Sequence, residues 1–249
     1  MFIRKGVFMM MTTIKYEILK VIRNKRFIMF TLVAPLFFYI LLYNMSSVKT
    51  GAMSMMLAVL CSTFATTGSG INTLSSRIAR EKPYINNVLI TTPYSPGKFV
   101  VITSAVQLLL NILIEAVIVA FGVALFHLTL TKDLLVMEGI ILYLSSFYVL
   151  VGLCLGFVLE LVALQAIAFP IYFLVMVTNI TQQMYPNMPK ALVIAQKAFP
   201  GFYATNLITS ISNNTKDLKS LLILTLYILG MLAITLLIYR RKQTAVAGT

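Results

Sequence analysis

The side chain most able to take part in chemistry is a carboxylate inside a long apolar stretch. Glu115 lies within the apolar run of residues 99–126. A charged carboxylate at the centre of a membrane costs roughly 2.5–3.5 kcal/mol on insertion scales. Gln107 and Asn111 precede it by eight and four residues, so all three share roughly one helix face. We expect a polar stripe in which Glu115 lines a substrate path, pairs with a basic group or stays protonated; a structural hydrogen bond is the alternative.

Further polar groups stand where apolar stretches end. Glu160 is the only charged residue between Gly139 and Thr181. Because this run is long enough for two membrane spans, we expect Glu160 in a tight turn between two helices. Asn179, Gln182 and Gln183 crowd the far end of the second of these helices. These amides line an exit path or hydrate an interface, and both interpretations stay open.

The sequence contains no residue pattern typical of an enzyme or a metal centre. His127 is the only histidine, and Gly97-Lys98 lacks the other residues of a phosphate-binding P-loop. Cys61 and Cys154 lie in apolar runs, which is typical of buried hydrophobic side chains rather than a disulfide framework. We therefore predict no catalytic residue, no metal site and no cofactor bound by this chain.

The elements that must position these residues are membrane-spanning helices. Of 249 residues, 59% are hydrophobic and only 11% are charged, with a mean hydropathy of +0.93. A soluble domain of this length could not bury so much apolar surface, whereas a bilayer accepts it. Six spans are expected, at about 27–43, 53–74, 99–126, 134–182 as two helices that turn near Glu160, and 218–239.

The segments between and before the spans have patterns of their own. Residues 12–26 combine an apolar stripe with a basic face, which is typical of an interfacial helix, or of an amphipathic helix that docks on another subunit. Residues 183–214 are broken by prolines and predict short helices at the outer interface. The small residues 66–70 predict close packing against another helix. The fold class is an all-α polytopic membrane protein with an N-terminal elbow helix (12–26), a six-span domain (27–239) and a tail (240–249).

The basic residues indicate the orientation. The net charge is +13. Fourteen of the 20 Lys and Arg residues flank one side of the predicted spans, seven before the first span, four in residues 75–98 and three after the last span. The positive-inside rule places that side, with both termini, in the cytoplasm. We therefore interpret the charge as membrane topology and predict a lipid bilayer, not nucleic acid, as its partner.

Residues 75–98 form the longest polar stretch between spans. Arg80-Glu81-Lys82 leads into a short helix at about 84–90, and Thr92-Pro93 ends it. A helix joined to two spans at their cytoplasmic ends would transmit a push to both of them. An ordinary solvated loop whose charges only set topology is the alternative.

The chain resembles the permease subunit of ABC-2 type exporters from about Thr12 to Lys242. That family carries a cytoplasmic coupling helix between spans two and three, with the pattern Gly-Thr-Leu-Glu-x-Leu-x-x-Thr-Pro after an Arg-Glu-rich lead. Leu89, Thr92 and Pro93 match, while Tyr84-Ile85 replaces the Gly-Thr pair and Asn87 the acidic position. The resemblance extends more softly to Gln165-Ala166, to residues 186–189 and to residues 199–203, an outer re-entrant segment in the family.

The resemblance implies a function and a set of site residues. The chain would pair with a second permease subunit, identical or different, and with two copies of a separate ATPase subunit that binds ATP and Mg²⁺, in the plasma membrane of a bacterium. The ATPase would contact Arg80, Glu81, Lys82, Tyr84, Asn87, Leu89, Thr92, Pro93 and Glu160. The translocation path would include Gln107, Asn111, Glu115, Asn179, Gln182 and Gln183.

The expected activity is therefore export of a hydrophobic or amphipathic compound, such as an antibiotic, a peptide or a lipid-like molecule. Alternating access driven by the ATPase would move this compound out of the cell. A membrane scaffold or sensor subunit that transports nothing, and an ion-coupled transporter, are the alternatives.

Overall fold

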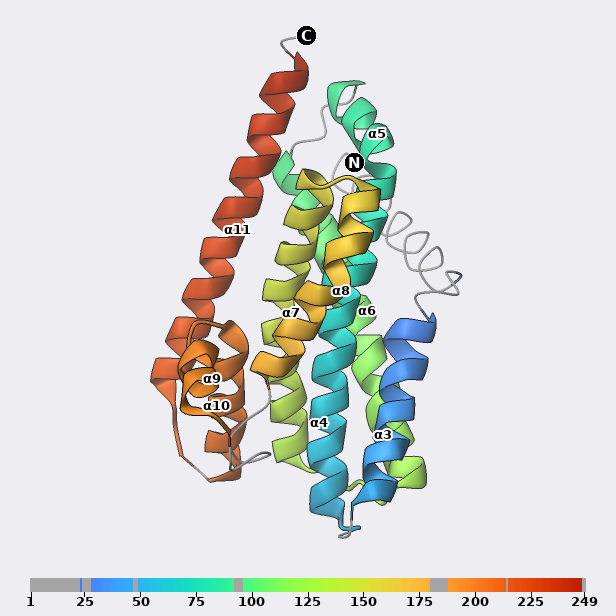
Figure 1. The fold of residues 1–249 in the computed structure, drawn as a ribbon, viewed down its shortest axis with the longest axis vertical. Helices are drawn as coiled ribbons and strands as arrows, with labels where there is room; N and C mark the ends of the chain where they lie inside the picture. Colours follow the sequence, from blue (N-terminus) through green and yellow to red (C-terminus); the bar gives the residue numbers. More distant parts are fainter. Residues whose placement is uncertain are drawn as a thin grey trace, which may run out of the picture.

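Every regular element in the described part of the chain is a helix. The computed structural model describes residues 23, 28–46, 49–91, 96–179, 188–213 and 215–247, with only the backbone at 30, 84, 86–91, 96–98 and 242–247. The elements are η1 (Met29–Val33), α3 (Ala34–Met45), α4 (Gly51–Gly68), η2 (Ser69–Leu74), α5 (Ser75–Thr91), α6 (Pro96–Leu125), α7 (Lys132–Val158), α8 (Leu161–Thr178), α9 (Lys190–Gln196), α10 (Pro200–Ser212) and α11 (Leu218–Ala247). Figure 1 shows them as an elongated bundle.

Five helical stretches are long and apolar enough to cross a membrane. They are Gly51–Pro83, Phe99–Leu125, Lys132–Val158, Leu161–Thr178 and Leu218–Arg241, and a shorter apolar helix, Thr31–Met45, precedes them. Each of them overlaps one of the six predicted spans, although the bounds of the second and the last span differ from the prediction. By helix length and hydropathy the chain is a multi-pass membrane protein. The predicted elbow helix at 12–26 lies outside the described residues, apart from Arg23.

The second span differs from its prediction. The sequence predicts a polar loop with a separate short helix over residues 75–98, but α4, η2 and α5 form one helix from Gly51 to Thr91. Ile78 is buried among α7 residues such as Leu153, so the core continues past the predicted end of the span. The lead residues around Arg80 are also good helix formers, which favours continuation over a loop.

The last span is also longer than expected. The tail predicted from residue 240 is helical, because α11 continues past Arg240 and Arg241 to Ala247. Residues 240–247 contain neither glycine nor proline, so nothing in them ends the helix. The turn near Glu160 and the short helices α9 and α10 are confirmed.

Helix α7 lies at the centre of the bundle and contacts α4, η2, α5, α6, α10 and α11. Glycines permit its closest approach: a Cβ on Gly152 would lie 2.0 Å from the Gly70 carbonyl oxygen in η2. This confirms the prediction that residues 66–70 pack closely against another helix. The η2 segment is π-helical, a distortion that often occurs at functional sites.

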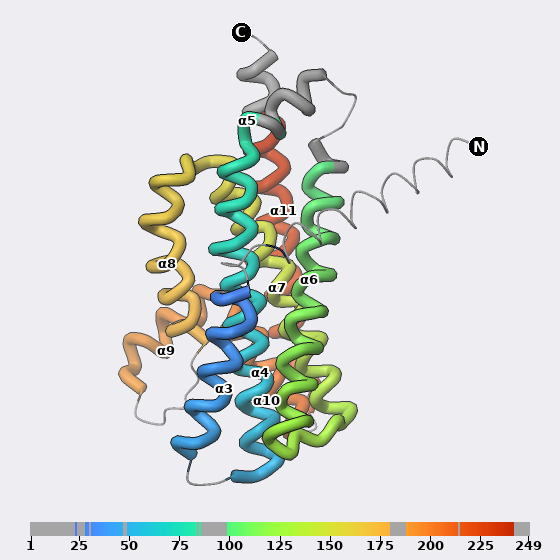
Figure 2. Tube along the Cα trace, turned by 90° about the vertical axis from the view of Figure 1, so that its right-hand side faces the viewer, coloured from blue at the N-terminus to red at the C-terminus, as the bar shows by residue number. Residues whose placement is uncertain are grey.

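We name the two ends of the bundle by the helices that they hold. The α5 end holds the far part of α5, the turn at 159–160 and the last turns of α11, while the α10 end holds α9, α10 and the start of α4 (Figure 1). Figure 2 shows α8 and α6 on opposite sides of the bundle.

Apolar side chains such as Phe169 on α8 and Leu222 on α11 are exposed, as expected of surfaces that face lipid.

Candidate functional site

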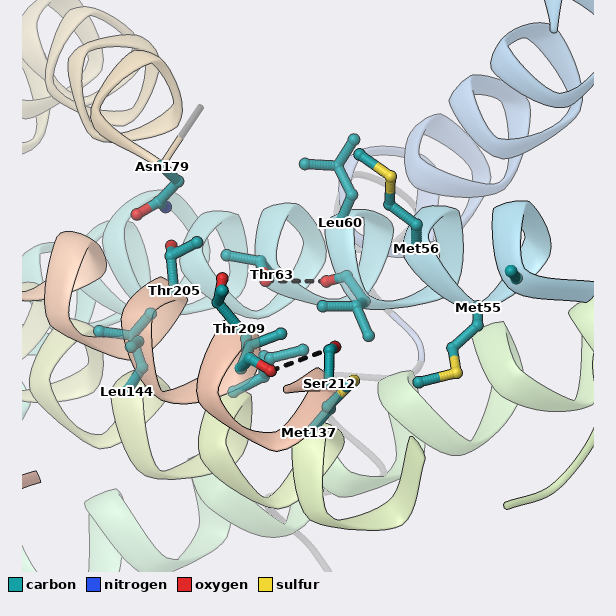
Figure 3. Close-up of a pocket in the computed structure, with 15 residues that line it drawn as sticks. Met55, Met56, Leu60, Thr63, Met137, Leu144, Asn179, Thr205, Thr209 and Ser212 are labelled. Atoms are coloured by element: carbon teal, nitrogen blue, oxygen red, sulfur yellow. Dashed lines mark hydrogen bonds between the residues drawn. The ribbon is translucent and has the colours of Figure 1, made fainter. Parts of the chain in front are cut away.

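An amphipathic groove opens near the α10 end of the bundle. We call it the α4–α10 groove, and its volume is about 290 Å³. It is lined by Ala52, Met55, Met56, Val59, Leu60 and Thr63 of α4, by Met137, Ile141 and Leu144 of α7, by Asn179, and by Ala204, Thr205, Ile208, Thr209 and Ser212 of α10. Figure 3 shows these side chains around the opening between the helices.

Helical periodicity builds the two walls. The lining residues of α4 recur every three or four positions from Ala52 to Thr63, so they form one stripe. On α10 the hydroxyls of Thr205, Thr209 and Ser212 follow the same spacing. Pro200 stands at the start of α10, where proline suits the first helical turn. The groove therefore has a methionine-rich apolar wall and a hydroxyl-bearing wall.

Asn179 supplies the most distinctive polar group in the groove. It ends α8, and its side chain is only 6% exposed. Its amide nitrogen and oxygen make no hydrogen bond of standard geometry in the described residues, although the Tyr148 hydroxyl of α7 lies close enough to interact with this amide. Gly201 of α10 packs directly against this amide, because a Cβ there would lie 1.7 Å from Asn179 Oδ1. A buried amide whose hydrogen bonds are incompletely formed is costly, so Asn179 has donor and acceptor capacity left for a ligand.

The groove hydroxyls are satisfied within their own helices. Thr63 Oγ1 donates to the Val59 carbonyl at 2.8 Å, and Thr205 Oγ1 donates to the Gly201 carbonyl at 2.9 Å. Each hydroxyl oxygen keeps lone pairs that can accept further hydrogen bonds. The volume lies near the lower end of the roughly 300–1,000 Å³ typical of ligand pockets. The groove therefore suits a small amphipathic compound, or one part of a larger one.

The predicted polar stripe on α6 lies inside the bundle rather than in the groove. Gln107 Nε2 donates to Ser69 Oγ of η2, and Asn111 Nδ2 donates to Ser145 Oγ of α7 at 3.1 Å. All three predicted residues are buried, Glu115 with 6% of its surface exposed. The stripe therefore joins α6 to its neighbours, and its part in a translocation path stays a prediction.

Sequence reasoning missed a second buried carboxylate. Glu138 of α7 is 7% exposed, and the Ser62 hydroxyl of α4 donates to its Oε1 at 3.2 Å. The Glu115 and Glu138 carboxyls are close enough to interact electrostatically. In the sequence Glu138 resembles a charge at the end of a span, because it lies only six residues after Lys132. Its spacing of seven residues from Ser145, which places both on one face of α7, is the signal that could have found it.

The residues predicted to contact an ATPase converge at the α5 end. Lys82 Nζ of α5 donates to the Leu159 carbonyl at 3.3 Å, in the turn that carries Glu160. Arg80 and Glu160 are exposed, while Glu81 is half-buried. Tyr84, Asn87 and Leu89 lie on the α5 backbone, further along the helix. Thr92 and Pro93, like Gln182 and Gln183 of the predicted path, lie outside the described residues.

We call the charged residues at the α5 end, Arg80 and Lys82 of α5 and Glu160 of the turn between α7 and α8, the charged junction. The chain is thus a multi-pass helical membrane protein with an amphipathic groove near one end and this junction at the other. No protein-family model, curated protein or solved structure matches the chain.

Proposed function

We propose that this chain is the membrane-spanning permease subunit of an ATP-driven exporter. Its cargo is a hydrophobic or amphipathic compound, and ATP hydrolysis takes place on a separate subunit. The chain acts with a second permease subunit and two ATPase subunits in a bacterial plasma membrane, with both termini in the cytoplasm.

One observation carries this proposal: a single helix connects the groove to the charged junction. The stretch Gly51–Pro83 contains the α4 wall of the groove and the basic part of α5. At 1.5 Å per residue its 33 residues extend about 50 Å. The Lys82 contact joins this helix to the turn between α7 and α8. A force applied at the α5 end therefore acts on three helices that border the groove.

The lining of the groove supports the cargo class. Methionine side chains adapt to apolar ligands of varied shape, and Met55, Met56 and Met137 all line the opening. The Asn179 amide offers one directional polar contact beside this apolar surface. Separation of α4 from α10 would release such a compound, and differential ATP binding would drive the change between inward-facing and outward-facing states.

The decisive experiment is purification of the tagged chain from its native membrane after crosslinking. We expect an ATPase with Walker motifs to copurify in roughly equal amount. Reversal of charge at the junction, by Arg80→Glu with Glu160→Lys, should reduce the recovered ATPase at least about tenfold, equivalent to about 1.4 kcal/mol of binding. Insertion into the membrane should be unchanged, because both side chains are exposed.

Lys132→Glu is the matched control, since Lys132 is exposed at the start of α7 at the opposite end. This variant should retain the ATPase. Recovery of no ATPase with the unmodified chain would refute the proposal. Equal loss with Lys132→Glu would refute the assignment of the α5 end as the contact surface.

A specific observation favours a second candidate, an ion-coupled transporter. Such transporters usually need ionisable groups buried within the membrane, and Glu115 and Glu138 are two of them. This candidate predicts transport without any ATPase partner, so the same purification separates the two functions.

A further inference from the structure

Two carboxyl groups interact in the interior of the bundle, and no cation in the described residues compensates them. In the described residues the groups that interact with Glu115 and Glu138 are the two carboxyls themselves, the Ser62 hydroxyl, and the side chains of Tyr39 and Cys61, none of which is a cation. Glu115 lies ten residues before the end of α6, which is roughly 15 Å along the helix. It therefore lies well inside the apolar part of the membrane, where an unpaired charge is strongly disfavoured.

Several acceptor oxygens on these helices lack a hydrogen-bond donor in the described residues. Glu115 Oε1 and Glu138 Oε2 have no hydrogen-bond partner in the described residues. Gln107 Oε1 and Asn111 Oδ1, on the same face of α6, also have none. A carboxylate can only accept hydrogen bonds, but a neutral carboxylic acid can also donate one. Addition of a proton to the pair would give one carboxyl a donor with which to hydrogen-bond a neighbouring acceptor oxygen.

The other titratable groups near this pair, in the part of the chain that the structure describes, do not provide positive charge. Cys61 of α4 and Tyr39 of α3 both interact electrostatically with Glu138, and Tyr172 of α8 interacts with Cys61. All three are neutral when protonated, and Tyr39 is already hydrogen-bonded to Ser54. Burial disfavours the charged form of each carboxyl, and a negative charge on one further disfavours ionisation of the other.

We propose that Glu115 and Glu138 form a proton-binding site within the membrane, in which at least one carboxyl is a neutral acid at about neutral pH. The proton comes from water: a carboxylate and a hydronium ion give a carboxylic acid and a water molecule. The site does not depend on the transport proposal, because its test needs neither cargo nor ATPase.

The site lies directly behind the wall of the α4–α10 groove. Ser62, which donates to Glu138, is followed by Thr63, which lines the groove. Glu138 itself follows Met137, another lining residue. A movement that separates α4 from α7 would both widen the groove and break the hydrogen bond between Ser62 and Glu138. Occupancy of the groove and binding of the proton would therefore influence one another.

Infrared spectroscopy of the purified full-length chain tests the proposal directly. A neutral carboxylic acid has a carbonyl stretch that is separate from the bands of carboxylates and amides. The chain is studied at about neutral pH in a maltoside detergent, which has no ester carbonyl. We expect this band to be present, to shift when the glutamates are labelled with carbon-13, and to be lost in the double variant Glu115→Gln with Glu138→Gln.

The control variant is Glu160→Gln, which alters an exposed carboxyl and should leave the band intact. Glutamine resembles the neutral acid in shape and hydrogen bonding, so the double variant should remain folded, with an unfolding midpoint close to that of the unmodified chain. If it fails to fold, the carbon-13 shift in the unmodified chain still identifies a neutral glutamate. Absence of the band, a band that ignores the glutamate label, or a band unchanged in a folded double variant would overturn the proposal.

Discussion

The sequence predicts where Asn179 lies along its helix but does not explain why its side chain is buried. Its position at the end of an apolar run predicts a polar group near the outer surface. Its burial depends on Gly201, which lets α10 approach the amide. Residues 180–200 separate the two in the chain, so only the folded arrangement brings them together. The same contact makes Gly201 a sensitive position for substitution.

Substitution of Gly201 by alanine should displace the Asn179 amide. The new Cβ would lie 1.7 Å from Asn179 Oδ1, so the amide or α10 must move. Strain of this kind typically costs about 1–3 kcal/mol. We expect a lower thermal unfolding midpoint in detergent, together with weaker binding of a fluorescent acyl-chain probe in the groove.

Gly230 provides the control for this substitution. A Cβ at Gly230 of α11 would meet no atom within 4 Å. Gly230→Ala should therefore leave the unfolding midpoint unchanged or raise it slightly, because alanine favours helix over glycine. Equal effects of the two substitutions would contradict the close contact between Gly201 and Asn179.

At the scale of elements, the packing of α7 against η2 depends on the absence of side chains. Gly152 lies against the backbone of Gly70, and a Cβ on Gly156 would lie 2.7 Å from the Ser75 carbonyl oxygen. These contacts bring the π-helical segment close to the centre of the bundle. They also hold Ser69 where Gln107 can donate to it. The helix that joins the groove to the α5 end is therefore fixed to α7 near its middle.

Gly152→Ala should separate α7 from η2. Its Cβ would lie 2.0 Å from the Gly70 carbonyl oxygen, a backbone atom that cannot rotate away. We expect a loss of about 1–3 kcal/mol in the free energy of unfolding, measured by denaturation in mixed micelles.

Gly139→Ala, in the same helix, is the matched comparison. A Cβ there meets nothing within 4 Å, so stability should be unchanged or slightly greater. A Gly152→Ala protein as stable as the unmodified one would show that η2 and α7 are packed less closely than the structure places them.

At the scale of the whole molecule, the orientation in the membrane follows from charge. The α5 end carries Arg77, Arg80, Lys82, Arg240 and Arg241, whereas the basic residues at the α10 end are lysines. Much of the predicted asymmetry comes from the seven basic residues before Phe27, most of which lie outside the described residues. The orientation with the α5 end in the cytoplasm stays a prediction.

Cysteine labelling tests that orientation. An impermeant maleimide should label Lys49→Cys in intact cells, since Lys49 is exposed between α3 and α4 at the α10 end. Glu160→Cys should react only after the membrane is permeabilised. The unmodified chain is the control: Cys61 is buried and Cys154 half-buried within helices, so neither should react from intact cells. Labelling of Glu160→Cys alone in intact cells would reverse the assignment of the two ends.

Local composition was enough to establish the class of the protein and the approximate positions of its spans. Apolar runs of sufficient length specify membrane helices, because the bilayer selects for hydrophobic segments long enough to cross it. The turn at Glu160 and the short helices before the last span are also predictable from local sequence, because single residues mark where the apolar runs are interrupted. The breaks come from local residues such as Pro189 and Pro200.

The meeting of particular polar groups, in contrast, depends on how the helices pack. In the sequence Glu138 resembles a charge at a span end, but the fold buries it and Ser62 of α4 donates to it. The sequence likewise does not tell that Gln107 and Asn111 donate to serines of neighbouring helices. The groove exists because α10 returns to the bundle beside α4, more than a hundred residues away in the chain. Helical periodicity tells which residues share a face, but the neighbour of that face is set by the arrangement of all the helices together.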